Sequence, residues 1–161
     1  MSDKPTRERL GSLLIELLEG AAFVFAEVSD DKPWAEGDLL CARLVLEHGE
    51  RVELALCVPG ELARTLAANL LALEPESEEA KTSAGDAVGE LANMIAGTLA
   101  VEMFGADVVC KIGVPRVAPE TGVEHDGHFG RARTRVSLRT EDGHRVDASL
   151  SDVATEADSL P

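Results

Sequence analysis

The spacing of hydrophobic residues changes from a helical to an extended pattern near the start of the chain. Between Thr6 and about Gly20, leucines recur at intervals of three and four residues, which places them on one face of an α-helix. These leucines are Leu10, Leu13, Leu14, Leu17 and Leu18. Gly20 is a typical helix stop. The apolar run from Ala21 to Val28 then predicts a strand, and Ser29 to Gly37 predicts a turn-rich connection.

Two extended segments follow, and a short connection joins them. Leu39–Glu47 and Arg51–Val58 are both strand-like, and His48-Gly49-Glu50 lies between them. A short connection that contains glycine is typical of a β-hairpin. After a Pro-Gly strand break, leucines at helical spacing predict a helix over Glu61–Leu73.

The second half of the chain begins with a long predicted helix. The acidic segment Glu74–Ser83 predicts a surface loop or a frayed helix start. Ala84–Phe104 predicts a helix that ends at Gly105. The β-branched segment Asp107–Val114 predicts a strand, and Arg116–Asp126 predicts a loop.

The last part of the chain predicts two strands and a tail. Phe129–Thr140 alternates as a strand does, with four arginines on one face. They are Arg131, Arg133, Arg135 and Arg139. They form a solvated or edge-protecting face, or alternatively a salt-bridged dimer seam opposite acids such as Asp142 or Asp147. Arg145–Leu150 predicts the last strand, and the acidic residues 151–161 predict a disordered tail.

The predicted order of elements is a helix, three strands, two helices and three strands. Strands joined by hairpins pair antiparallel, so we expect an α+β fold with a mostly antiparallel sheet and helices packed on one face. Each half has a helix followed by strands, which predicts a pseudo-two-fold relation between the halves. Residues 1–150 are expected to form one domain.

Composition narrows the class of protein. Only 3% of the 161 residues are aromatic, so the core must be aliphatic. The formal charge of −15 repels nucleic acid and anionic membranes, and neither is expected as a partner. This excess of acid serves solubility or attracts a partner with a basic rim.

The cysteines and the absence of an apolar leader indicate a reducing compartment. Cys41, Cys57 and Cys110 form no CxxC pair and lie in apolar stretches, so we expect free buried thiols. The chain starts without a signal-peptide pattern, and no apolar run approaches the roughly 20 residues of a membrane span. A cytoplasmic location is therefore expected.

The helix expected over Ala84–Phe104 has one polar and small face. At about 100° per residue, five positions share a stripe along it. The stripe consists of Asp86, Glu90, Asn93, Gly97 and Ala100. The opposite face, expected to pack on the sheet, consists of Val88, Leu91, Ile95 and Leu99. Met94 borders the stripe as an adaptable apolar contact, and the small residues would let a partner's backbone approach.

The string GELANMIAG, residues 89–97, resembles the active-site helix of the CheC/CheX chemotaxis phosphatases and of the related flagellar switch protein FliY. The family pattern is Asp or Ser, then Glu, then Asn, and a proline downstream. Asp86, Glu90 and Asn93 match it in identity and spacing, and Pro115 follows after 21 residues, one fewer than in the family. The resemblance is sharp over residues 84–115 and architectural elsewhere, and is nearest to CheX-like members with a single site.

The resemblance implies hydrolysis of the aspartyl phosphate of a CheY-like response regulator. Asn93 would orient the attacking water, and Glu90 would pair with the regulator's lysine. The other residues expected to bind the partner are Asp86, Met94, Gly97 and Pro115. Asp86 also suits a helix start. Mg²⁺ is expected in the partner's receiver domain, so no cofactor is expected from this chain.

Two alternatives remain beside this reading. The shorter spacing to Pro115 favours a non-catalytic receiver-binding or scaffold module of two-component signalling. Ser12, Glu16 and Glu19 repeat the motif spacing in the first helix, either by chance or as a silent counterpart, because an ionised Glu19 cannot donate a hydrogen bond. CheX-like proteins form homodimers, so a homodimer is expected.

No metal site is expected. The candidate is His125-Asp126-Gly127-His128, which lies in a predicted polar loop with no third ligand in view. The sequence also has no GxSxG motif, no CxxC motif and no phosphate-binding glycine loop.

Overall fold

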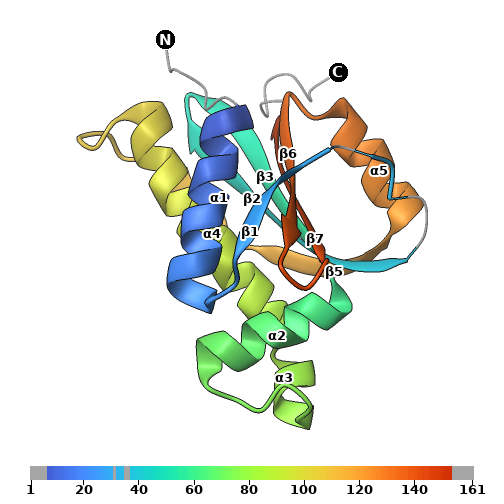
Figure 1. Cartoon of the computed structure of the whole chain (residues 1–161). Coiled ribbons are helices and arrows are strands. Elements are labelled where there is room, and N and C mark those ends of the chain that lie inside the picture. The colour runs from blue at the N-terminus through green and yellow to red at the C-terminus, as the bar shows by residue number, and fades with distance from the viewer. Residues whose placement is uncertain (1–6, 31, 35–36, 154–161) are drawn as a thin grey trace.

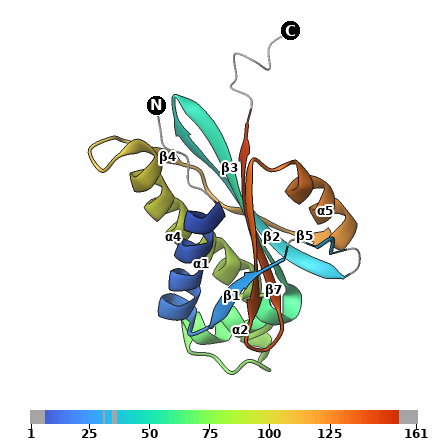
Figure 2. The ribbon, with the colours of Figure 1, turned by 45° about the horizontal axis from the view of Figure 1, so that its top comes forward.

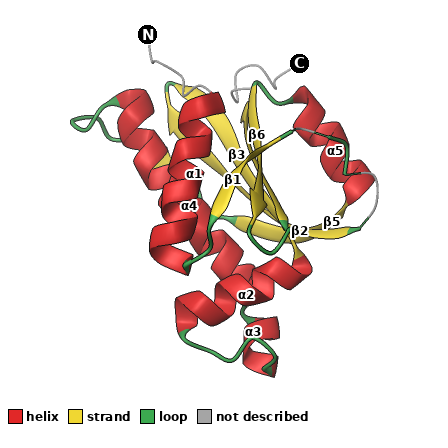
Figure 3. Cartoon of the chain, in the orientation of Figure 1, coloured by secondary structure: helices red, strands yellow, loops and turns green. Residues whose placement is uncertain are grey.

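The computed structural model describes residues 7–30, 32–34 and 37–153. These residues form an α+β fold, which confirms the predicted fold class (Figure 1, Figure 3). The helices are α1 (Arg7–Ala22), α2 (Gly60–Leu71), α3 (Glu78–Thr82), α4 (Ala84–Phe104) and α5 (Gly122–Arg131). The strands are β1 (Ala26–Ser29), β2 (Asp38–His48), β3 (Glu50–Pro59), β4 (Lys111–Ile112), β5 (Arg116–Thr121), β6 (Thr134–Thr140) and β7 (Arg145–Asp152).

One antiparallel sheet of seven strands organises the chain. Its order is β1-β6-β7-β3-β2-β4, and β5 pairs with the first half of β2. The predicted hairpin is confirmed as β2 and β3, whose residues pair one for one around Gly49. Gly49 has a φ of 77°, a left-handed conformation that glycine adopts without steric cost. This turn therefore sets the register of the two strands.

Each half of the chain pairs with the hairpin of the other half. β1, which follows α1, pairs with β6, and β5, which follows α4, pairs with β2. The hairpins β2–β3 and β6–β7 meet through β3 and β7 in the middle of the sheet. Two related halves would exchange strands in this way, and the pseudo-two-fold relation itself stays a prediction.

The hydrophobic core lies between one face of this sheet and the helices α1, α2 and α4 (Figure 2). Alternate residues of the central strands point into it. They include Val52, Leu54, Leu56 and Val58 of β3 and Val146, Ala148 and Leu150 of β7. Each fully buried valine or leucine among them contributes about 1.5–3 kcal/mol. The core is aliphatic, as the low aromatic content predicts.

Helix α5 covers the opposite face of the sheet, and the sequence pattern does not predict it (Figure 1). Arg116–Asp126 is predicted as a loop, but its residues form β5 and the start of α5. The Thr121 hydroxyl caps α5 by accepting a hydrogen bond from the N–H of Glu124. The expectation that helices pack on one face only is therefore wrong, and the strand predicted from Phe129 begins at Thr134.

Two predicted strands are shorter in the structure. Helix α1 continues to Ala22, so the strand predicted over Ala21–Val28 begins only at Ala26. Of Asp107–Val114, only Lys111 and Ile112 form a strand, and the Gly113 N–H donates one further hydrogen bond to the Val45 carbonyl of β2. Both segments are apolar, but a strand also needs a neighbouring edge to which its backbone can donate and accept hydrogen bonds.

The acidic segment and the tail also differ in part from the prediction. The Ser77 side chain caps the short helix α3 by accepting a hydrogen bond from the Ala80 N–H. Ser151 and Asp152 belong to the predicted tail but complete β7. The rest of the predicted tail, residues 154–161, lies outside the described residues.

Helix α4 is the one described helix that is long and apolar enough to cross a membrane, with a mean hydropathy of 1.2 over 18 residues. This differs from the expectation that no apolar run approaches that length. Within the fold, 56% of those residues are buried. The apolar composition of α4 is therefore that of a helix at the centre of the core.

Replacing a buried leucine of α4 tests this role. Leu91→Ala should lower the free energy of unfolding by about 2–5 kcal/mol, because it leaves a cavity at a side chain that is 1% exposed. The matched control is Leu71→Ala at the end of α2, where the side chain is 51% exposed and the loss should be small. Chemical denaturation measures both, and equal losses would contradict the assignment of α4 to the core.

Candidate active site on helix α4

Helix α4 packs on the sheet with one face and presents the predicted stripe on the other. Every residue of the predicted apolar face is buried. Asp86, Glu90 and Asn93 are exposed, as the helical spacing predicts. Asp86 lies in the first turn, where a carboxylate is favourable beside the positive end of the helix dipole.

The polar residues of the stripe are unengaged within the described chain. Among the described residues, Asp86 and Glu90 form no ion pair, and the Asn93 carboxamide forms no hydrogen bond. Residues three apart on a helix are neighbours on its surface, roughly 5–6 Å apart at their Cβ atoms. Glu90 and Asn93 therefore present a carboxylate and a carboxamide side by side with their hydrogen-bonding capacity unused.

The small end of the stripe is only partly open. A Cβ atom built on Gly97 would meet nothing within 4 Å, so this position leaves clearance beside Asn93. Met94 is half-buried and packs against the core with its apolar side chain. Ala100 is 7% exposed, and its predicted place on an open groove is therefore wrong. Helix α1 packs beside α4, and Arg9 of α1 forms an ion pair with Glu102 near the end of α4.

Pro115 lies beside the motif although it is distant in sequence. A Cβ atom built on Gly89 would lie 3.7 Å from the Pro115 Cβ and 3.3 Å from the Val117 Cγ2. The absence of a side chain at Gly89 thus lets the segment before β5 approach α4 next to Glu90. The structure therefore brings Pro115 against the motif helix, although the two are separated in sequence.

The first helix carries the residues that repeat the motif spacing. Ser12, Glu16 and Glu19 are exposed on α1, which lies beside α4 (Figure 1, Figure 2). Glu16 also contributes to raising the pKa of Arg9, after the hydrogen bond and the charge of Glu102. A silent second site on α1 stays a prediction.

A family model matches the part of the chain that contains α4. The model of the family described as chemotaxis phosphatase CheX matches residues 41–139, from β2 to β6. The chain belongs to the CheX chemotaxis phosphatase family. A comparison with curated proteins finds no match.

Solved structures share the fold of this CheX-family chain. CheX from Vibrio vulnificus aligns with a TM-score of 0.65 at 18% identity, over 94% of this chain and 100% of that one. A CheX–CheY–BeF3–Mg²⁺ complex from Borrelia burgdorferi aligns with a TM-score of 0.65 at 16% identity, with the same coverage. FliY from Thermotoga maritima aligns at 0.56 and 12% identity, over 91% and 89% of the two chains.

A buried polar network on the opposite face of the sheet is absent from the sequence prediction. His125 of α5 bonds through Nε2 to the Asp147 Oδ2 at 2.6 Å. The Asp147 Oδ1 accepts from Ser137 at 2.6 Å and from Arg145 at 2.9 Å. Burial would raise the pKa of Asp147, but hydrogen bonds from its three partners lower it. Burial would lower the pKa of His125, but Asp147 and Cys41 raise it to about 9.

This network corrects two premises of the sequence prediction. His125 lies in a helix and is 2% exposed, whereas the spacing predicts a polar loop. Asp147 is 1% exposed and engaged within the chain, so it cannot face an arginine of a second copy. Of the predicted arginine face, Arg133 pairs with Asp152, and Arg135 donates to the Gly130 carbonyl at 2.9 Å.

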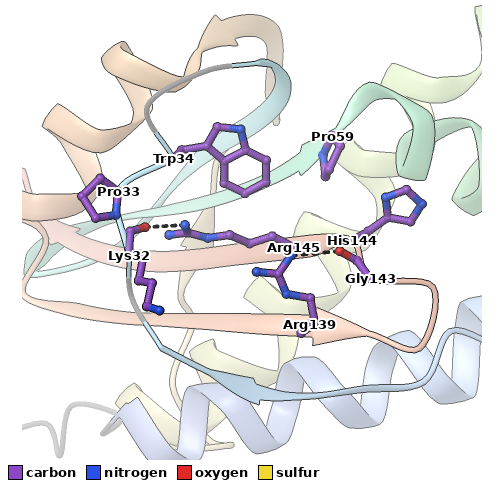
Figure 4. Close-up of a pocket in the computed structure, with 8 residues that line it drawn as sticks. All are labelled: Lys32, Pro33, Trp34, Pro59, Arg139, Gly143, His144 and Arg145. Atoms are coloured by element: carbon purple, nitrogen blue, oxygen red, sulfur yellow. Dashed lines mark hydrogen bonds between the residues drawn. The ribbon is translucent and has the colours of Figure 1, made fainter.

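A cleft opens beside the network at the end of the β6–β7 hairpin (Figure 4). Its lining consists of Lys32, Pro33, Trp34, Pro59, Arg139, Gly143, His144 and Arg145. The Arg145 guanidinium lies 4.9 Å from the centre of the Trp34 ring and donates to the Lys32 carbonyl. Arg139 donates to the Gly143 carbonyl at 2.9 Å. Both guanidinium groups thus hold the segment around Trp34 and the hairpin turn in place.

A pair of glycine variants on α4 tests the packing of the site. Gly89→Leu should lower the free energy of unfolding by about 1–3 kcal/mol, because the added side chain would displace Val117 and Pro115. Gly97→Leu should leave stability unchanged or raise it, because the position is open and leucine favours the helix over glycine. Thermal unfolding distinguishes them, and a reversed order would contradict the described geometry.

Proposed function

We propose that this CheX-family chain accelerates hydrolysis of the aspartyl phosphate on a CheY-like receiver domain. The observation that supports this most directly is the exposed Glu90–Asn93 pair, unengaged on the helix that carries the family motif, with Pro115 beside it. The solved CheX complex with CheY, BeF3 and Mg²⁺ supports a receiver domain as the partner.

The proposed chemistry divides between the two proteins. An aspartyl phosphate in a receiver domain is already activated, and Mg²⁺ in that domain compensates the charge of the phosphoryl oxygens. What remains is to place a water in line with the bond from phosphorus to the aspartyl oxygen. The CheX-family chain supplies this placement, so it needs neither a nucleophile nor a metal ion for this step.

Asn93 is the residue that orients the water. A carboxamide has an oxygen that accepts and a nitrogen that donates. The Asn93 oxygen would accept a hydrogen bond from the attacking water, while its nitrogen would donate to a phosphoryl oxygen. The gain comes from position rather than from proton abstraction, because a carboxamide is not a base at neutral pH.

Glu90 determines how the partner docks. Its exposed carboxylate would pair with the lysine of the receiver's active site, and this ion pair fixes the distance between Asn93 and the phosphoryl group. Met94 and Pro115 border the pair, and the open position at Gly97 gives the receiver's backbone clearance. Asp86 would act at the rim of this contact and at the helix start.

Asn93→Ala is the decisive variant. It should reduce the acceleration of phosphate release by about 10²-fold or more, because it removes a positioned hydrogen-bonding group. Val101→Ala is the control, since Val101 is 52% exposed on the same helix and lies about two turns beyond Asn93. Phosphate release from a panel of phosphorylated receiver domains measures the effect. Unchanged turnover in Asn93→Ala would contradict the proposal that Asn93 orients the attacking water.

Glu90→Gln tests docking separately from chemistry. It should raise KM for the phosphorylated receiver more than it lowers kcat, because the lost ion pair acts mainly in binding. Glu79→Gln removes the same charge from an exposed position of α3 and should change neither constant. Equal behaviour of the two variants would show that general charge, not a specific pair, attracts the receiver.

The alternative is a receiver-binding module without catalysis. It is favoured by the shortened spacing between Asn93 and Pro115. Retention of the phosphorylated receiver with no change in its decay rate would support it. A homodimer, a cytoplasmic location and a single domain over residues 1–150 also stay predictions.

A further inference from the structure

Four side chains of metal-binding types converge on the sheet face opposite α4. They are Cys41 of β2, Cys57 of β3, Glu120 of β5 and His125 of α5. One ligand atom from each lies within 4.8 Å of the other three. Both thiols and the imidazole are buried, and the Glu120 side chain is 12% exposed. The group is thus compact and largely shielded from water.

The two cysteines are held together by the central hairpin. Cys41 and Cys57 are direct cross-strand partners, so their side chains leave the sheet on the same face. Both are free, buried thiols. The hairpin therefore presents a preformed pair of sulfur atoms to any ligand on this face.

His125 is oriented as a metal-binding histidine is. Its Nε2 is committed to the Asp147 carboxylate, whereas its Nδ1 is buried and has no hydrogen-bond partner. Leaving a buried polar atom unpaired is unfavourable. Histidine ligands typically bind the metal with one nitrogen and donate the other N–H to a carboxylate. The orphaned Nδ1 and the carboxylate on Nε2 match that arrangement.

The charges around the cluster leave room for a divalent cation. With both thiols deprotonated, the four negative groups would be Cys41, Cys57, Glu120 and Asp147. Arg43, which donates to both Glu120 oxygens at 3.0 Å, and Arg145, which donates to Asp147, compensate two of these charges. A divalent cation would offset the negative charge that remains, which is at least two because Arg43 also pairs with Glu53 at 3.3 Å. Glu120 could bind it with one oxygen and keep Arg43 on the other.

The donor set selects zinc among the common divalent cations. Thiolate sulfur and imidazole nitrogen are soft or borderline ligands, which Zn²⁺ binds in tetrahedral geometry. Bond lengths of 2.0–2.3 Å give ligand-to-ligand distances of roughly 3.3–3.8 Å in a tetrahedron. The four ligand atoms, within 4.8 Å of one another, need to close by only about an ångström. Four protein ligands complete the coordination sphere, which is typical of a structural site.

We propose that Cys41, Cys57, Glu120 and His125 bind one Zn²⁺ that fastens α5 and β5 to the sheet. A metal ion would stabilise α5 where apolar packing is limited. Three of its ten residues are glycine, and only a small apolar cluster lies on this face. This site lies on the opposite side of the sheet from Asn93 and does not depend on the proposed phosphatase activity. It replaces the expectation that the chain has no metal site.

Metal content and cobalt substitution test the proposal. The untagged chain, purified under reducing conditions, should contain one zinc per chain by mass spectrometry of the elements. After exchange for Co²⁺, it should show thiolate-to-cobalt charge-transfer absorption and the visible bands of a tetrahedral site. Cys41→Ser and Cys57→Ser should each bind Zn²⁺ at least about 10²-fold more weakly in chelator competition. Cys110→Ser, at the third and less buried cysteine, is the matched control and should bind normally.

Two outcomes would overturn the site without reference to the variants. One is a folded wild-type chain that neither contains metal nor gains the cobalt absorption. The other is an intact mass lower by two hydrogens under non-reducing conditions, together with a linked peptide pair that contains Cys41 and Cys57, which would assign them to a cross-strand disulfide instead. Hydrogen exchange supplies an independent readout: removing zinc should increase exchange in α5 and leave α4 unchanged. Equal exchange in both states would exclude a structural role for the metal.

Discussion

Burial of one face of α4 against the sheet is the interaction on which the rest of the structure depends. Val88, Leu91, Ile95 and Leu99 are all at most 1% exposed, and their contacts fix the rotation of the helix about its axis. Because a helix has 3.6 residues per turn, this rotation also decides which residues face solvent. Packing of the core therefore positions Glu90 and Asn93 for a partner, although neither residue contributes to the core.

The β2–β3 hairpin connects this core to the opposite face. Along each strand, alternate side chains enter the aliphatic core, and those between them reach the layer under α5. The same two strands thus supply Leu44 and Leu54 to one side and Cys41 and Cys57 to the other. The two faces differ in how they are held: the first by apolar burial, the second by a buried ionic network around Asp147 and His125. A buried network of this kind is stable only when each charge has a partner, which explains why Arg145 and Ser137 converge on one carboxylate.

How far the sequence predicts this chain depends on the strength of local signals. The bounds of α4 and of the central hairpin agree closely with the prediction, because periodicity, a glycine turn and a glycine stop all coincide there. Helix α5 has a weaker signal: Thr121 and Glu124 have the spacing of a capping box, but only His125 and Phe129 are large buried side chains, and its glycines favour a loop. One signal of the second cluster was available, since Cys41 and Cys57 are equally distant from Gly49 and must therefore face each other across a hairpin centred there.

The sequence by itself determined the α+β class, the apolar face of α4 and the exposed positions of Glu90 and Asn93. These features follow from spacing within single elements, which a helical or strand period fully specifies. The tertiary structure decided what depends on contacts between distant segments. It placed Pro115 beside Gly89, buried Ala100, and brought Glu120 and His125 to the two cysteines. No local period encodes these approaches, because they depend on how β5 and α5 pack on a sheet built from the whole chain.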